Sequence, residues 1–225
     1  MIALRHRSDP TPTLAPLAGL VVRREENAST MATLQRRGLS DIQRRFDAGH
    51  RAYVAYLHGA PAAFGWVATT SAEIGELAST FAIPRGERYL WNFVTLEQYR
   101  GLGVYPRLVD AIVRIESREA ERFWIAYAPE NHASASGVRK AGFTALAELS
   151  FDHAGRPAVQ AVVPGAARIV SRLLGLPESR TALTPCWRCA RAGRGVMYCA
   201  AGECRCDYQI PASGCATHHA ATPHA

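Results

Sequence analysis

The pattern of apolar and polar residues predicts strands and helices over most of the chain. Between 29 and 47, Met31, Leu34 and Ile42 recur at helical spacing, and Gly38 interrupts the stretch, so two consecutive helices are predicted. Helices are also predicted at 108–118, 132–141 and 167–176. Runs rich in aromatic and β-branched residues predict strands at 19–25, 51–59, 62–70, 88–95, 122–128, 143–151 and 157–163.

This order of elements predicts one mixed α/β sheet domain followed by a separate module. The domain covers residues 18–163 and contains a βαβ unit around 88–128. Residues 1–17 contain Pro10, Pro12 and Pro16 without any periodicity, so a loose N-terminal extension is predicted. A linker helix is expected within 164–184. All six cysteines fall in 185–225, which predicts a small Cys-rich module there.

The composition narrows the class of protein. A hydrophobic content of 48% and a charged content of 20% are ordinary for a globular protein, and the sequence lacks an apolar run long enough for a membrane span or a signal peptide. A cytoplasmic protein is therefore predicted. The formal net charge is +7, but Lys140 is the only lysine and the arginines are scattered along the chain. This favours a bias in composition over a surface that binds nucleic acid.

Two glycines lie between a predicted strand and a predicted helix, in the stretch "EQYRGLGVYPRL" from Glu97 to Leu108. A helix beginning there would leave its first N–H groups without partners, and Gly101 and Gly103 would let an anion approach the backbone closely. Pro106 removes no needed donor in a first helical turn. The stretch predicts either a phosphate-binding loop or a plain turn. It lacks the third glycine of G-x-G-x-x-G, because Pro106 stands there.

Two motifs in this order resemble those of the GNAT superfamily of acyl-CoA N-acyltransferases. "QYRGLG", residues 98–103, resembles the family's pyrophosphate loop, Q/R-x-x-G-x-G/A. "NHASASGVRKAGF", residues 131–143, resembles its N-x-x-S segment ending in K-x-G-F. The resemblance covers residues 18–163. It implies a GNAT-like fold and acetyl-CoA as the co-substrate.

The resemblance also implies where acetyl-CoA would lie. The sheet would splay between the strands at 89–95 and 122–127, and the pantetheine arm would pair with the backbone of Phe93 and Thr95. Asn131 and Ser134 match positions that contact that arm or the thioester, although Asn131 could equally be a helix cap. The pyrophosphate would rest on the backbone amides of Arg100, Gly101, Leu102, Gly103, Val104 and Tyr105.

The acid and the base of the reaction are less defined. Many family members carry a tyrosine that protonates the leaving thiolate, at the position that Val138 occupies in this chain. Ser134 and Tyr127 are the predicted catalytic residues, with Tyr105 or water as alternatives. Backbone N–H groups could stabilise the oxyanion. The general base stays open among four candidates, which are Glu73, Glu76, Glu130 and His132.

The cysteines predict a metal site in the C-terminal module. Two cysteines three positions apart form a knuckle whose thiolates converge on one ion, and a later pair can complete a tetrahedral site. Structural zinc is predicted, with an Fe–S cluster, a redox dithiol pair and disordered thiols as alternatives. The candidate ligands are Cys186, Cys189, Cys199, Cys204 and Cys206.

Together these features predict an N-acetyltransferase that transfers acetyl from acetyl-CoA to a primary amine of a small molecule or a protein. The alternative is an inactive acyl-CoA-binding sensor or adaptor whose Cys-rich tail binds a protein or nucleic acid. Val138 favours the alternative, whereas the glycine loop favours both equally.

Overall fold

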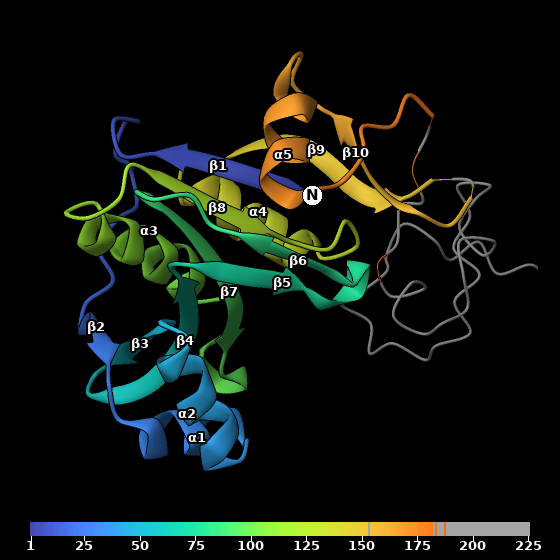
Figure 1. Ribbon diagram of the computed structural model, residues 1–225. Coiled ribbons are helices and arrows are strands. Elements are labelled where there is room, and N and C mark those ends of the chain that lie inside the picture. Colours follow the sequence, from blue (N-terminus) through green and yellow to red (C-terminus); the bar gives the residue numbers. More distant parts are fainter. Residues whose placement is uncertain (153, 182, 184–186, 188–225) are drawn as a thin grey trace, which may run out of the picture.

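The computed structural model describes residues 1–152, 154–181, 183 and 187, and these form one mixed sheet with helices on both faces (Figure 1). The strand order is β10-β9-β1-β8-β7-β4-β3-β2, and only β7 and β8 are parallel. The strands are β1 (Ile2–His6), β2 (Leu20–Glu25), β3 (Arg51–Leu57), β4 (Ala60–Ala68), β7 (Glu87–Thr95), β8 (Arg122–Ala126), β9 (Thr144–Phe151) and β10 (Pro157–Ala161).

The helices and a small hairpin complete the described fold. The hairpin pairs β5 (Ser71–Ile74) with β6 (Ser79–Ala82). The helices are α1 (Ala28–Gln35), α2 (Leu39–Asp47), α3 (Val104–Glu116), α4 (His132–Lys140) and α5 (Ala166–Leu174), and the short 3₁₀ turns are η1 (Gly75–Leu77) and η2 (Glu97–Tyr99). No helix in this part of the chain has the length and apolar character needed to cross a bilayer.

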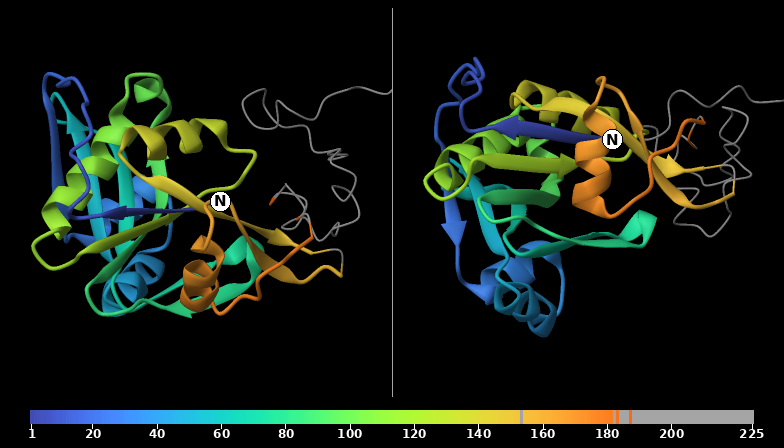
Figure 2. Two further views of the ribbon diagram at one scale, coloured as in Figure 1. Left: turned by 90° about the horizontal axis from the view of Figure 1, so that it is seen from above. Right: turned by 45° about the horizontal axis from the view of Figure 1, so that its top comes forward.

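The two faces of the sheet carry different cores. Alternate residues of a strand point to opposite faces, and in β3 Tyr53 joins the core under α3 and α4, whereas Val54 joins the core under α1 and α2. A third core, around Trp124, lies under α5 and the β5–β6 hairpin. The view from above in Figure 2 shows α4 on one side of the sheet and α5 with the hairpin on the other.

Most predicted elements are present, so the prediction of a mixed α/β sheet is confirmed. The predicted helix at 167–176 is α5, and it packs on the sheet. Three strands were missed. The β5–β6 hairpin lies in a stretch for which no element was predicted. The loose extension predicted at 1–17 is wrong at its start, because Ile2–His6 forms β1 between β8 and β9.

The position of β1 depends on a buried arginine. Arg5, 3% exposed, donates to Asp110 of α3 at 2.8 Å and to the carbonyl of Ala141 at 2.8 Å, just after α4. A buried charge is tolerated when it is paired. Arg5 therefore connects β1 with both helices of the same face.

A second buried ion-pair network holds the C-terminal end of α3. The carboxylate of Glu116 is fully buried and accepts from Arg51 at 2.9 Å, from Arg88 at 2.7 Å and from the Tyr53 hydroxyl at 2.6 Å. Burial and the hydrogen bond to Glu116 raise the pKa of Tyr53. These contacts fix α3 to β3 and β7, and so fix the position of its N-terminal end.

Candidate active site

The site begins where two parallel strands separate. Pairing of β7 with β8 runs from Glu87 opposite Arg122 to Leu90 opposite Ile125, while β7 continues beside β4 as far as Thr95. A bulge marks the separation, because the register of β4 with β7 shifts there and Asn92 has a φ of 51°, a left-handed conformation that asparagine tolerates. The splay that the resemblance implied is therefore present.

The free edge of β7 faces this gap. The Leu96 amide donates to Ala62 of β4 at 2.9 Å, and successive residues of a strand direct their N–H groups to alternate sides. Phe93 and Thr95 accordingly direct their backbone groups away from β4. These are the two residues that were predicted to pair with the pantetheine arm.

The glycine loop delivers a row of unpartnered amides beside the gap. Gly101 and Gly103 have φ values of 79° and 71°, so both need glycine, and α3 begins directly afterwards without a side-chain cap. Among the described residues no acceptor exists for the amides of Gly101, Leu102, Gly103, Val104 and Tyr105. The Arg100 amide, also predicted to face the anion, is instead used, because it donates to Glu97 at 3.1 Å.

An arginine adds positive charge to this loop. Arg107, in the first turns of α3, folds back and donates to the carbonyl of Gly103 at 2.7 Å and to that of Ala15 at 3.0 Å. The helix dipole and the free amides already favour an anion at this end of α3. The free amides, the start of the helix and Arg107 together give this loop a positive electrostatic character at the edge of the gap.

The predicted site residues beside the loop come together from α3, α4 and β7. The Asn131 side chain accepts from the Ser134 amide at 3.0 Å, so Asn131 is the N-cap of α4. The Ser134 hydroxyl lies 3.2 Å from the Tyr105 hydroxyl of α3. The Tyr105 ring meets Phe93 of β7 edge-on, with 5.5 Å between centroids. The predicted residues of both motifs are therefore connected by direct contacts.

The ionisation of the tyrosines is set mainly by burial. Burial raises the pKa of Tyr105 to about 12. The hydrogen bond with Ser134 lowers this pKa, and the nearby Tyr127 raises it slightly. Burial likewise raises the pKa of Tyr127, whose ring packs at the edge of the same core. Both hydroxyls keep their protons at neutral pH. Val138 is 1% exposed within the core and supplies no hydroxyl.

The four candidate bases lie in two segments, one in β5 and η1 and the other at the start of α4. Glu73 is exposed on β5, Glu76 belongs to η1, and His132 is exposed in the first turn of α4. Glu130 is 3% exposed and accepts from the amide of Trp187 at 3.3 Å. The geometry does not single out one of them as the base.

Two glycines make room for the aromatic rings of the site. A Cβ added to Gly65 of β4 would lie 2.1 Å from the Phe93 ring, and one added to Gly137 of α4 would lie 2.2 Å from the Tyr105 ring. Neither glycine has a left-handed backbone among the described positions. Their function is to let the two rings approach the backbone. Sequence reasoning missed both, because the contacts join residues distant in the sequence.

We expect Gly137→Ala to lower the free energy of unfolding by about 1–2 kcal/mol, although alanine favours a helix by about 1 kcal/mol over glycine. The clash dominates because the Tyr105 ring is rigid and held against Phe93. Urea denaturation measures the difference. Gly75→Ala is the control, since a Cβ there meets nothing within 4 Å. Equal stability of Gly137→Ala and the wild type would contradict this reading of the packing.

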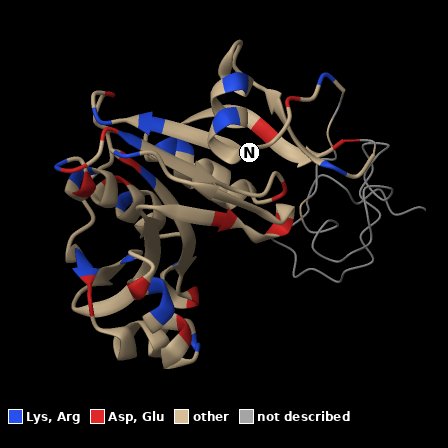
Figure 3. Cartoon of the chain, in the orientation of Figure 1, with Lys and Arg blue, Asp and Glu red and all other residues tan. Residues whose placement is uncertain are grey.

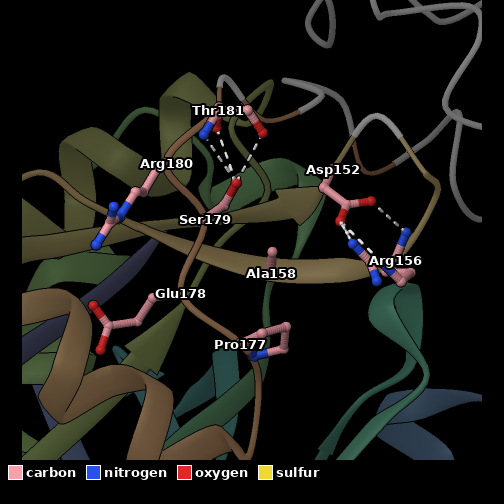
Figure 4. Close-up of a pocket in the computed structure, with 8 residues that line it drawn as sticks. All are labelled: Asp152, Arg156, Ala158, Pro177, Glu178, Ser179, Arg180 and Thr181. Atoms are coloured by element: carbon pink, nitrogen blue, oxygen red, sulfur yellow. Dashed lines mark hydrogen bonds and ion pairs between the residues drawn. The ribbon is translucent and has the colours of Figure 1, made fainter.

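A polar pocket lies elsewhere, between the start of β10 with the turn that precedes it and residues 177–181 (Figure 4). It has a volume of about 260 Å³, and the ion pair of Asp152 with Arg156, at 2.9 Å, closes one side. None of the predicted site residues lines it. The lining residues are Asp152, Arg156, Ala158, Pro177, Glu178, Ser179, Arg180 and Thr181.

The predicted metal ligands lie outside the described residues. Cys186, Cys189, Cys199, Cys204 and Cys206 all belong to positions that the structure does not describe. Within the described part, no cluster of three or more His, Cys, Asp or Glu side chains could hold a metal ion. Zinc in the tail stays a prediction from cysteine spacing.

Comparison with known proteins gives structural similarities only. No family model and no curated protein sequence match the chain. It is similar to a GCN5-related N-acetyltransferase from Kribbella flavida. The sequence identity is 15%, the similarity covers 55% of this chain and 46% of that chain, and the TM-score is 0.38. It is also similar to an aminoglycoside acetyltransferase from an uncultured soil metagenomic sample, in complex with sisomicin, with 11% identity, 60% and 95% coverage and a TM-score of 0.47.

A third similar structure is the aminoglycoside acetyltransferase AAC(6')-Ib in complex with coenzyme A and kanamycin. Here the identity is 17%, the similarity covers 61% of this chain and 90% of that chain, and the TM-score is 0.45. At these identities and TM-scores, none of the three similarities decides what this chain does.

Proposed function

We propose that this protein is an acyl-CoA-dependent N-acyltransferase, which transfers acetyl from acetyl-CoA to a primary amine. The row of unpartnered amides at the start of α3, directly beside the edge of β7 that β8 leaves free, carries the proposal. Such a row, at a positive helix end, suits a pyrophosphate. The adjoining backbone of Phe93 and Thr95 suits a chain of amides such as pantetheine.

The reaction needs the thioester aligned with a neutral amine. The amine nitrogen attacks the thioester carbonyl carbon, the carbon–sulfur bond breaks, and the CoA thiolate takes up a proton while the new amide loses one. Tyr105 of α3 and Ser134 of α4 bring two hydroxyls into contact within the site. We assign the proton for the thiolate to this pair, with Tyr105 as donor and Ser134 as its hydrogen-bond partner. Tyr127 and water are the remaining candidates.

A sensor that binds acyl-CoA without turnover is the second candidate function, and the burial of Val138 at the position of the family's tyrosine favours it. The Tyr105–Ser134 pair favours the enzyme. Release of the CoA thiol from acetyl-CoA, measured across a panel of primary amines, distinguishes them. Tight CoA binding without thiol release for any amine would support the sensor.

We expect Leu102→Asp to weaken CoA binding by about 10-fold, because the new carboxylate would repel the pyrophosphate at the loop. Leu102 is 48% exposed, so the fold should be unaffected. Isothermal titration calorimetry measures the affinity, and the difference should shrink at high salt. Ile169→Asp, at a 51% exposed position on α5, is the matched control. Equal CoA affinity of Leu102→Asp and the wild type would remove the loop from the site.

A further inference from the structure

The bulge in β7 turns two successive side chains toward the face of α1 and α2. The Trp91 ring lies 5.2 Å from His50 and 6.2 Å from Trp66 between centroids, and the Asn92 amide donates to Gln35 of α1 at 3.2 Å. The next residue, Phe93, faces Tyr105 on the opposite side. These side chains therefore lie across the sheet from the hydroxyl pair, at the level where β8 leaves β7.

Several nitrogens of this group of side chains lack a hydrogen-bond partner. One oxygen of Gln35 accepts from Arg45 at 3.0 Å, from Trp66 at 3.3 Å and from Asn92. The Gln35 amide nitrogen, the Trp91 indole nitrogen and Nδ1 of His50 are buried, and none has a hydrogen-bond partner in the described structure. Buried polar atoms in folded proteins are nearly always paired. Three unpaired nitrogens in one cluster therefore indicate a missing partner.

The same group contains an arginine without an acid. The guanidinium of Arg45 lies 5.2 Å from the centre of Trp66 and 4.7 Å from that of Trp91. No carboxylate of the described residues comes within ion-pair distance of it, although α2 itself carries both acidic and basic residues (Figure 3). Burial, and then Arg37, lowers the pKa of Arg45, against the weaker influence of Asp41 and Glu73. A half-buried cation without a counter-ion is stabilised when an anion binds beside it.

The chemistry of the partner follows from these two observations. Burial and the neighbouring Arg45 lower the pKa of His50, so the ring is neutral at pH 7 and Arg45 is the cation of the cluster. A group that only accepts hydrogen bonds and carries a single negative charge matches one cation and several N–H groups. An ionised carboxylate has both properties, whereas a phosphate carries more charge than one arginine balances.

We propose that Gln35, Arg45, His50 and Trp91, here called the donor cluster, bind a carboxylate of the amine acceptor. This assignment rests on the proposed function, because it places the acceptor on the side of β7 opposite the hydroxyl pair. The acceptor is then an amino acid or an amine of similar form, whose carboxylate enters the donor cluster while its amine points to the gap between β7 and β8. Arg45 shifts from the tryptophan rings to meet the carboxylate.

Pairs of acceptors that differ by one carboxylate test this assignment. Acetyl transfer is measured with lysine against cadaverine and with phenylalanine against phenethylamine, and O-phosphoethanolamine tests a phosphate in the same place. Binding without acetyl-CoA is followed by tryptophan fluorescence, since Trp66 and Trp91 lie in or beside the cluster. At least one carboxylated member is expected to exceed its partner by about 10-fold or more in kcat/KM and in affinity.

Gln35→Glu is the decisive variant. A glutamate keeps an oxygen for Arg45, Trp66 and Asn92, but replaces the unpartnered nitrogen with a second oxygen and gives Arg45 a counter-ion. The preference for the carboxylate should be lost, while CoA affinity stays unchanged. Gln43→Glu on α2 is the matched control, because Gln43 is exposed and bonds only to Asp47 among the described residues. This control should keep the wild-type preference.

The outcomes separate this inference from the function on which it rests. Equal use and equal binding of both members of every pair, or an unchanged preference in Gln35→Glu, would overturn the carboxylate site. A preference for O-phosphoethanolamine over every carboxylate would overturn it as well. Carboxylate binding without any CoA binding would keep the site and remove the acyltransferase. CoA binding with transfer only to amines that lack a carboxylate would keep the acyltransferase and remove the carboxylate site.

Discussion

Replacing Glu116 with alanine is expected to lower the free energy of unfolding by about 3–5 kcal/mol, because it leaves buried cations without their anion. The Glu116 carboxylate has no exposed surface, and the side chain of Arg88, which donates to it at 2.7 Å, is only 8% exposed. The hydroxyl of Tyr53 would also lose its acceptor. Thermal and urea unfolding of the two proteins under the same conditions measure the difference.

The neighbouring Glu119 provides the control for this prediction. It pairs with the same two arginines, with Arg51 at 2.6 Å and with Arg88 at 3.1 Å, yet its side chain is 56% exposed. Water and salt screen such a pair, so Glu119→Ala should cost less than about 1 kcal/mol. Similar losses for Glu116→Ala and Glu119→Ala would show that burial is not what makes Glu116 important.

The elements that sequence reasoning predicted were those with a long and regular pattern. α3 buries one face over several turns, so its apolar residues recur at helical spacing, and the β3–β4 hairpin and β7 are long runs rich in aromatic and β-branched residues. β1 has only five residues and is buried almost throughout, so it shows no alternation, and the three prolines that follow it predicted a loose extension. Its partner Asp110 is 105 residues away, and no local pattern reveals that pair.

Only part of the candidate site is likewise visible in local sequence patterns. The glycine loop and Asn131 were predictable, because left-handed glycines before a helix and an N-cap are local features. The contact of Tyr105 with Ser134 depends on how α3 and α4 pack, and the space for it comes from Gly137. The donor cluster joins side chains from α1, α2, the following turn and β7. Only the folded chain places them together, so no spacing in the sequence predicts them.

Removing the Tyr105 hydroxyl tests the assignment of the proton donor. Tyr105→Phe is expected to lower kcat by about 100-fold or more, which is the lower range for a general acid. The phenyl ring keeps its contact with Phe93 and its place against Gly137, so the fold and the affinity for CoA should be preserved. Steady-state kinetics with the best amine of the panel, together with calorimetric CoA binding, measure both quantities.

The pH dependence and two variants complete the test. Because burial raises the pKa of Tyr105 to about 12, the hydroxyl stays protonated between pH 7 and 10, and it should cause no decline of kcat over this range. Ser134→Ala removes the partner hydroxyl and should cost less than Tyr105→Phe. Tyr56→Phe is the control, since it removes a hydroxyl bonded to Glu25 at the far edge of the sheet. If Tyr105→Phe turned over as fast as Tyr56→Phe, the proton would have to come from Tyr127, Ser134 or water, and Tyr105 would be a packing residue.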